Sequence, residues 1–497
     1  MKKEKIISLI ILILIFIATL STIIIRPLGD LDELWNYNFA RNVAKGLIPY
    51  KDFNMLQMPL LPLLCGFILK ITVDQLFIMK LIAAITSGLI LFLIYKIFKL
   101  LKINNKMVII FMTLIGYLYH DILYIDYNWM SLLLVLCIVY IELKQYKTNK
   151  KMLTLNPKAD ILIGILAGLT FMLKQTSGFL ICIAAVWNKL IDVKSKEDLK
   201  LFFKSFAYRL IGILIPILLM FIYLFCNNTI DDFISYTIKG ASGFTNYISY
   251  ARLLRLNLMG LFSILVPLLI IYELYNIVIK NNKKHLYFLY IYGLAIFIIA
   301  FPISDKIHFV IGSTLFIILL LIEVYDIFKK IYFKHIKNKE LLRKTSIVIL
   351  EYIDIILIVA VLIYSFINYS TFLKKNHSQI NHYKNVVINE NLENEIGQIN
   401  EFILKNDKKV IILDAQAVAY MIPIDKYNKN YDMLLKGNLG INGEQNLINE
   451  IDKSKNTQYL ILKSEYNLNW QTPLDVIQYT INNKRKIGEI GIFDIYE

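Results

Sequence analysis

Runs of apolar residues close to twenty long recur along this 497-residue chain, and they constrain its fold more than any other feature. About 20 helical residues cross the hydrocarbon core of a bilayer, so each such run predicts a membrane-spanning helix. A chain that is 57% hydrophobic carries more apolar surface than a soluble domain buries. The sequence therefore predicts an α-helical polytopic membrane protein and excludes a soluble one.

We expect about eleven spans. The first covers residues 6–25 and is too long for the apolar core of a signal peptide, with no small-residue cleavage site after it, so we expect it to be retained. The others are expected over residues 76–97, 107–119, 129–141, 161–173, 179–190, 210–225, 258–279, 286–301, 309–327 and 347–367.

Lysine tracts lie between the runs and follow every second one, whereas the intervening loops are poor in basic residues. Cytoplasmic loops of membrane proteins carry this excess of Lys and Arg. The formal net charge of +16 is therefore assigned to cytoplasmic loops at a bilayer rather than to nucleic-acid binding. We expect a multi-pass plasma-membrane protein with its N-terminus in the cytoplasm.

The composition changes after residue 367, where hydrophobicity falls and charge rises. Strand-like runs at residues 409–413, 459–463 and 487–496 alternate with helical patterns at residues 392–404, 444–451 and 474–482. Such alternation predicts an α/β domain. We therefore divide the chain into a transmembrane domain, residues 1–367, and an extracytoplasmic α/β domain, residues 368–497.

The first outer loop, about residues 26–75, places three carboxylates, Asp30, Asp32 and Glu33, within four positions. Further along this loop, residues 60–73 are apolar but too short for a full crossing, which suits an interfacial or re-entrant helix. Clustered charge beside a membrane is either a solvated loop or a site that acts on a membrane-bound substrate.

Other polar residues beside the expected spans fall on the same outer side. Ionisable groups near membrane depth are costly, so their convergence on one face is a functional-site hypothesis. A carboxylate accepts a proton from an attacking hydroxyl, and a lysine offsets charge on a departing phosphate. The sequence thus points to transfer from a lipid phosphate. The residues concerned are Asp126, Lys174, Gln175, Asp305 and His308, together with the first-loop acids.

The first outer loop also carries a resemblance. It contains Asp32-Glu33, an aromatic pair, Ala40-Arg41-Asn42, Gly46, Pro49-Tyr50-Lys51-Asp52-Phe53 and Pro59. This order resembles the first outer loop of GT-C glycosyltransferases, closest to the protein O-mannosyltransferase and lipid A aminoarabinose transferase branch and to bacterial RgtA/B/C/D-like proteins. Residues 164–178 and 302–308 are similar to weaker motifs of the same family, and the resemblance covers about residues 1–330.

The resemblance implies inverting transfer of a sugar from a polyprenyl-phosphate donor to a cell-envelope acceptor, which is a glycan, lipid or protein. It places Asp32, with Glu33, at the family's catalytic carboxylate and Asp126 at a second acid. Asp30 adds an acid that the family pattern lacks, so the base is either Asp30 or Asp32. We expect Asp30, Arg41, Asp126, Lys174, Gln175, Asp305 and His308 to contact substrate.

Each of these residues also has a purely structural interpretation. Asp32 and Asp126 suit the N-caps of helices, and Lys174 suits a lysine that extends to the interface. Arg41 either pairs with Asp52 or binds phosphate. No cofactor is required for this chemistry, although an acidic pair with His308 would suit a divalent cation.

Two other classes are open. A transporter or lipid flippase would need charges at the bilayer midplane and often has internally repeated halves, and no repeat is evident here. A polysaccharide polymerase or ligase for a lipid-linked glycan is chemically closer, but usually has a large late outer loop instead of an acidic first one.

Overall fold

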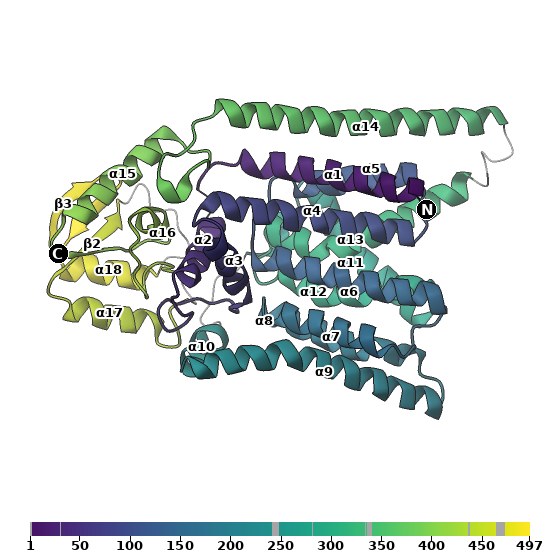
Figure 1. Ribbon diagram of the computed structural model, residues 1–497, viewed down its shortest axis with the longest axis horizontal. Helices are drawn as coiled ribbons and strands as arrows, with labels where there is room; N and C mark the ends of the chain where they lie inside the picture. The colour runs from purple at the N-terminus through teal and green to yellow at the C-terminus, as the bar shows by residue number, and fades with distance from the viewer. Residues whose placement is uncertain are drawn as a thin grey trace. The chain divides into compact units, whose positions relative to one another are not determined.

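Long helices dominate the computed structural model, which describes residues 2–29, 31–240, 248–280, 282–332, 334, 340–435, 438–463 and 473–497 (Figure 1). Within these ranges, seven helical segments are long and apolar enough to cross a membrane. They begin in α1 (Lys2–Ile24), α4 (Leu76–Leu100), α6 (Tyr127–Asn149), α9 (Lys196–Cys226), α11 (Leu258–Glu273), α13 (Lys306–Ile331) and α14 (Glu340–Lys374). The chain is thus a mostly helical protein with membrane-spanning character.

The four remaining expected spans also form helices, but each is shorter than 18 residues: α5 (Asn105–Tyr119), α7 (Pro157–Phe171), α8 (Gln175–Trp187) and α12 (Tyr287–Phe297). The expected short apolar segment of the first outer loop forms α3 (Leu60–Ile71), which follows α2 (Leu31–Ala44). The positions of all eleven expected helices are confirmed, whereas the number that cross the bilayer stays a prediction.

The chain divides into two compact units. The first, here called the helical unit, contains Met1–Ile23, Ile82–Leu218 and Tyr247–Thr371. The second, called the sheet unit, contains Ile24–Leu81, Leu219–Asn246 and Phe372–Glu497. The first outer loop therefore belongs to the same compact unit as the C-terminal segment, and the division into domains at residue 367 stays a prediction.

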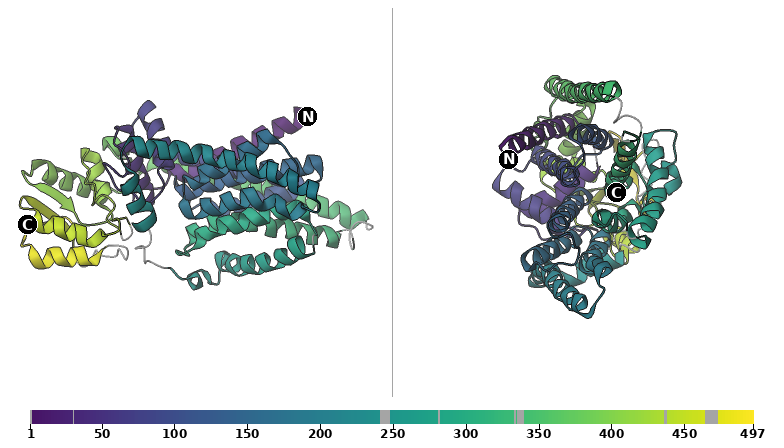
Figure 2. Two further views of the ribbon diagram at one scale, coloured as in Figure 1. Left: turned by 90° about the horizontal axis from the view of Figure 1, so that it is seen from below. Right: turned by 90° about the vertical axis from the view of Figure 1, so that its right-hand side faces the viewer.

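Within the helical unit, α7 and α9 approach closely because both carry glycine at the contact. A Cβ atom on Gly164 of α7 would lie 2.1 Å from the backbone oxygen of Arg209, and one on Gly212 of α9 would lie 2.3 Å from that of Ile161. No side chain fits at either position without separating the helices. The two helices run side by side in both views of this unit (Figures 1 and 2).

Four ionised side chains are buried together next to this contact. Asp160 of α7 accepts from Arg209 Nε and from Lys189 Nζ, both at 2.8 Å, and Arg209 Nη1 lies 2.8 Å from Glu142 Oε1. Two acids balance two bases, so no net charge is buried, as a low-dielectric interior requires. None of these four residues was predicted from the sequence.

The sheet unit contains a four-stranded sheet in the order β1-β2-β4-β3, formed by β1 (Lys409–Ile412), β2 (Thr457–Leu462), β4 (Phe493–Tyr496) and β3 (Lys486–Ile490). β1 and β2 are parallel, and the other pairs are antiparallel. The accompanying helices include α15 (Glu390–Lys405), α16 (Ala417–Met421), α17 (Gly443–Lys453) and α18 (Leu474–Asn483).

The expected strand over residues 487–496 is instead a hairpin of two strands. Gly491 lies at the turn with a φ of +52°, a conformation that glycine adopts without steric cost. The strand-like run contains two glycines, Gly488 and Gly491, and it reverses direction at the second. The other strand and helix predictions for this segment are confirmed within a few residues.

The glycine contact between α7 and α9 generates a prediction. Gly164→Ala should lower the free energy of unfolding by about 1–3 kcal/mol, because the added methyl group overlaps backbone atoms. Gly116→Ala, in α5, is the matched control: its Cβ would meet no atom within 4 Å, so it should be neutral or stabilising. Unfolding of the detergent-purified proteins measures both, and equal behaviour of the two variants would contradict the close contact.

Candidate functional site

A chain of hydrogen bonds joins three of the polar side chains at one end of α6. Asp126 caps this helix, since its Oδ1 accepts from the Trp129 backbone N–H at 2.7 Å. Its Oδ2 accepts from Asn128 Nδ2 at 2.9 Å, and Asn128 Oδ1 accepts from Lys174 Nζ at 2.8 Å. Asn128 therefore links the lysine to the acid, and Lys174 Nζ also lies 5.2 Å from the centre of the Tyr127 ring.

A second pair begins α13. Asp305 caps this helix by accepting from the His308 backbone N–H at 2.8 Å, and the same oxygen lies 2.9 Å from His308 Nδ1. If His308 is neutral, this contact holds the proton on Nδ1 and leaves Nε2 as the acceptor. The carboxylate thus fixes both the helix start and the ring orientation.

The two groups interact electrostatically. Lys174 interacts with Asp126 and with Asp305, and Asp126 interacts with His308. We call Asp126, Asn128, Lys174, Asp305 and His308 the polar cluster; all belong to the helical unit. Asp126, Lys174, Asp305 and His308, which come from three separate loops, were all predicted from the sequence, and they lie together. Gln175 follows Lys174 directly and begins α8. Asn128 was missed, although it follows Asp126 by two positions.

Burial sets the charge states of the cluster. It raises the pKa of Asp126, against hydrogen bonds from the Trp129 N–H and Asn128. It lowers the pKa of Lys174 to about 8, against the attraction of Asp126 and Asp305. Although burial opposes it, the hydrogen bond from His308 lowers the pKa of Asp305. Lys174 therefore loses its charge as the pH rises through about 8.

The first-loop acids lie in the sheet unit. Glu33 is 3% exposed, and both of its carboxylate oxygens accept from Lys80 Nζ, at 3.1 and 2.9 Å. Asp32 is partly exposed in the first turn of α2. Its backbone carbonyl accepts from Asn36 Nδ2 at 2.7 Å. Asp30 lies outside the described residues. Glu33 is thus half of a buried ion pair, and Asp32 is the more accessible carboxylate.

Arg41, also on α2, belongs to another cluster of the sheet unit. It is 1% exposed; its Nε lies 3.5 Å from Asp74 Oδ2, and its Nη2 pairs with Asp425. The alternative that Arg41 pairs with Asp52 is wrong, because Asp52 Oδ2 instead accepts from the Ile48 backbone N–H at 2.7 Å and closes a local turn.

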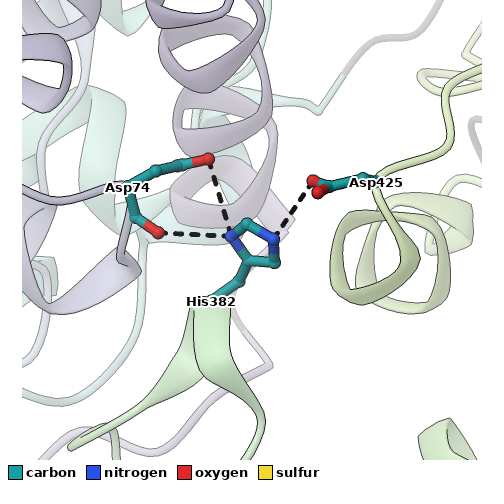
Figure 3. Close-up of side chains that lie close together, drawn as sticks. All are labelled: Asp74, His382 and Asp425. Atoms are coloured by element: carbon teal, nitrogen blue, oxygen red, sulfur yellow. Dashed lines mark hydrogen bonds and ion pairs between the residues drawn. The ribbon is translucent and has the colours of Figure 1, made fainter.

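His382 lies between the same two carboxylates (Figure 3). Its Nδ1 is 3.6 Å from Asp74 Oδ2 and 3.2 Å from the Asp74 backbone oxygen, and its Nε2 is 3.1 Å from Asp425 Oδ1. Asp74, His382 and Asp425 each offer one ligand atom, all within 4.8 Å of one another. A histidine with two carboxylates is a donor set that Zn²⁺ accepts.

The charges around this set fit a cation poorly. Arg41 contacts both carboxylates, and Lys45 Nζ pairs with Asp425 as well. These bases lower the pKa of Asp425 despite its partial burial. Two positive groups already neutralise the two acids, so a divalent cation would have to displace Arg41. We interpret the set as an ion-pair network that joins the first loop to the C-terminal segment inside the sheet unit.

Comparison with known proteins found no matching family model and no matching curated protein. Among solved structures, the chain is similar to an oligosaccharyltransferase of Archaeoglobus fulgidus in complex with Zn and sulfate. The TM-score is 0.45 and the identity 11%, over 97% of this chain and 72% of that one.

The buried pair of Glu33 and Lys80 generates a prediction. Lys80→Met removes the ammonium that pairs with the buried Glu33 carboxylate and should lower the free energy of unfolding by about 3–5 kcal/mol. The double variant Glu33→Gln/Lys80→Met should recover most of this loss, because no charge remains buried. Lys51→Met, at an exposed position of the same loop, should have little effect. Strictly additive losses in the double variant would contradict the pairing.

Proposed function

We propose that this chain is a membrane glycosyltransferase of GT-C type. It transfers a sugar from a polyprenyl-phosphate donor to a cell-envelope acceptor at the outer face of the plasma membrane, with inversion. The observation that carries the proposal is the polar cluster: a buried lysine whose pKa is lowered to about 8, held by Asn128 and flanked by acids from two other loops. The first-loop motif around Asp32 adds the family resemblance.

In the proposed reaction, Asp32 accepts the proton of the acceptor hydroxyl as its oxygen attacks the anomeric carbon of the donor sugar. The bond from that carbon to the phosphate oxygen breaks, and the polyprenyl phosphate leaves with the electron pair. Attack opposite the leaving group inverts the anomeric centre. We assign the role of base to Asp32 and not to Glu33, because Glu33 forms an ion pair with Lys80.

Lys174 is assigned to the donor phosphate. A fixed ammonium in a water-poor site stabilises the charge that develops on the leaving group. Asn128 is neutral, so its hydrogen bond positions Lys174 without cancelling its charge. Asp126 and Asp305 act through their neighbours as positioning residues, and His308 and Gln175 are assigned to the substrate beside Lys174.

The remaining assignments follow from the expected topology. Residues 368–497 are proposed to be extracytoplasmic and to bind or orient the acceptor. Arg41 is assigned to the support of the first loop through its ion pairs rather than to direct phosphate contact. The scheme requires no cofactor; a divalent cation at Asp74, His382 and Asp425 would bind only where Arg41 releases them.

The assigned base is tested by Asp32→Asn, which removes the proton acceptor and keeps the side-chain size. Transfer of radiolabelled sugar from a polyprenyl-phosphate donor should fall by about a hundredfold or more, with unchanged yield and unfolding temperature of the purified protein. Asp121→Asn is the control, because this exposed acid pairs with Lys306 outside the assigned groups. Full activity of the Asp32 variant would refute the assignment.

The assigned phosphate contact predicts a pH dependence. Lys174 is protonated below a pH of about 8 and loses its charge above it, so kcat/KM of the unaltered protein should fall as the pH rises through 8. Lys174→Gln should be slow at all pH values and lack this step. Lys174→Arg retains the charge, so any activity it keeps should persist above pH 8. An identical pH profile for the glutamine variant would contradict the role.

A further inference from the structure

A large apolar cavity lies in the helical unit between α1, α4, α5 and α14, which run side by side (Figures 1 and 2). Its volume is about 910 Å³, at the upper end of the range typical of ligand pockets. Most of its wall is aliphatic, with Leu14 from α1, Val108 and Met112 from α5, and Leu357 and Val361 from α14. This chemistry suits hydrocarbon chains.

One end of the cavity is cationic. Lys96 and Lys99, in the last two turns of α4, line it together with Asn105 at the start of α5. Lys99 Nζ donates to Asn105 Oδ1, and Lys96 Nζ lies 5.5 Å from the centre of the Phe92 ring. Among the described residues, no carboxylate forms an ion pair with either lysine, in contrast to Lys106, which pairs with Glu351 at 2.7 Å.

The two helices that flank the cavity are covered by little protein. The candidate spans in α1 and α14 are 22% and 11% buried, the smallest shares among the seven candidate spans of the described residues. In a bilayer, lipid covers the surfaces that protein leaves open. An apolar space between two such helices, lined by lysines at one end, is therefore suited to a lipid with a negative headgroup.

We propose that this cavity binds a diacyl phospholipid with an anionic headgroup. The acyl chains lie along α5 between α1 and α14, and the headgroup phosphate is held by Lys96 and Lys99. By the lysine distribution, this end of α4 faces the cytoplasm, so the lipid belongs to the inner leaflet. The inference goes beyond the proposed glycosyl transfer, whose lipid phosphate is assigned to Lys174 on the opposite side of the membrane.

The binding test uses the purified full chain in a neutral detergent. Phosphatidylglycerol and phosphatidylcholine with the same palmitoyl and oleoyl chains are titrated separately, and bound lipid is counted by native mass spectrometry. We expect one tight site for phosphatidylglycerol and much weaker binding of phosphatidylcholine. Lys96→Gln/Lys99→Gln should lower the affinity for phosphatidylglycerol by about thirtyfold, since each lysine near an anionic headgroup raises the affinity about fivefold.

A matched control tests whether position or total charge matters. Lys144 and Lys147 are exposed near the end of α6, have the same three-residue spacing and do not line the cavity. Lys144→Gln/Lys147→Gln removes the same charge and should leave phosphatidylglycerol binding unchanged. An equal loss in both double variants would show non-specific attraction and would overturn the proposal.

The apolar part is tested by filling the cavity. Gly116 lines it, and a Cβ there would meet no atom within 4 Å, so the side chain of Gly116→Phe enters the space without displacing backbone. This variant should abolish the tight site while keeping Lys96 and Lys99.

Three results would overturn the proposal: equal affinity for the two phospholipids, unchanged binding in Gly116→Phe, or displacement of phosphatidylglycerol by a lower concentration of undecaprenyl phosphate. The last would assign the cavity to a polyprenyl chain. None of these measurements depends on sugar transfer, so they are independent of the proposed enzyme activity.

Discussion

The burial of charge governs this molecule more than any other interaction. A bilayer offers no water to unpaired polar groups, so an ionised side chain at depth must find its partner within the protein. The structure meets this requirement with Asp160, Arg209, Glu142 and Lys189 between the helices of one unit, and with Glu33 and Lys80 in the other. Removal of one partner in such a group is therefore more damaging than removal of both.

The helices were predictable because the bilayer imposes a length on apolar runs. Every expected span has a helix at its position, and alternation alone predicted β1, β2, α15, α17 and α18. The hairpin at Gly491 was missed, because a glycine inside a strand-like run does not reveal whether the strand bends or reverses. The two compact units could not be predicted from the sequence, since Leu81 and Phe372, which bound the first and last segments of the sheet unit, are 291 positions apart.

Of the candidate site, the sequence identified residues by type but only some of their partners. Asp126, Lys174, Asp305 and His308 stood out as charges beside spans, and they lie together. The pairing of Lys80 was missed, although an ionisable residue inside the second apolar run predicts a buried partner. Asp74, His382 and Asp425 had no such signal, because each is an ordinary residue in a polar stretch, and only tertiary structure joins them.

The amide of Asn128 has a consequence for how the polar cluster responds to an approaching anion. A lysine bound directly to a carboxylate would have to break that pair before meeting a phosphate. Here Oδ1 of the neutral Asn128 side chain accepts a hydrogen bond from Lys174, and Nδ2 of the same side chain donates to Asp126. Asn128 thus holds the ammonium in place without a direct ion pair to Asp126. An incoming phosphate would accept a hydrogen bond from the ammonium without first displacing that carboxylate.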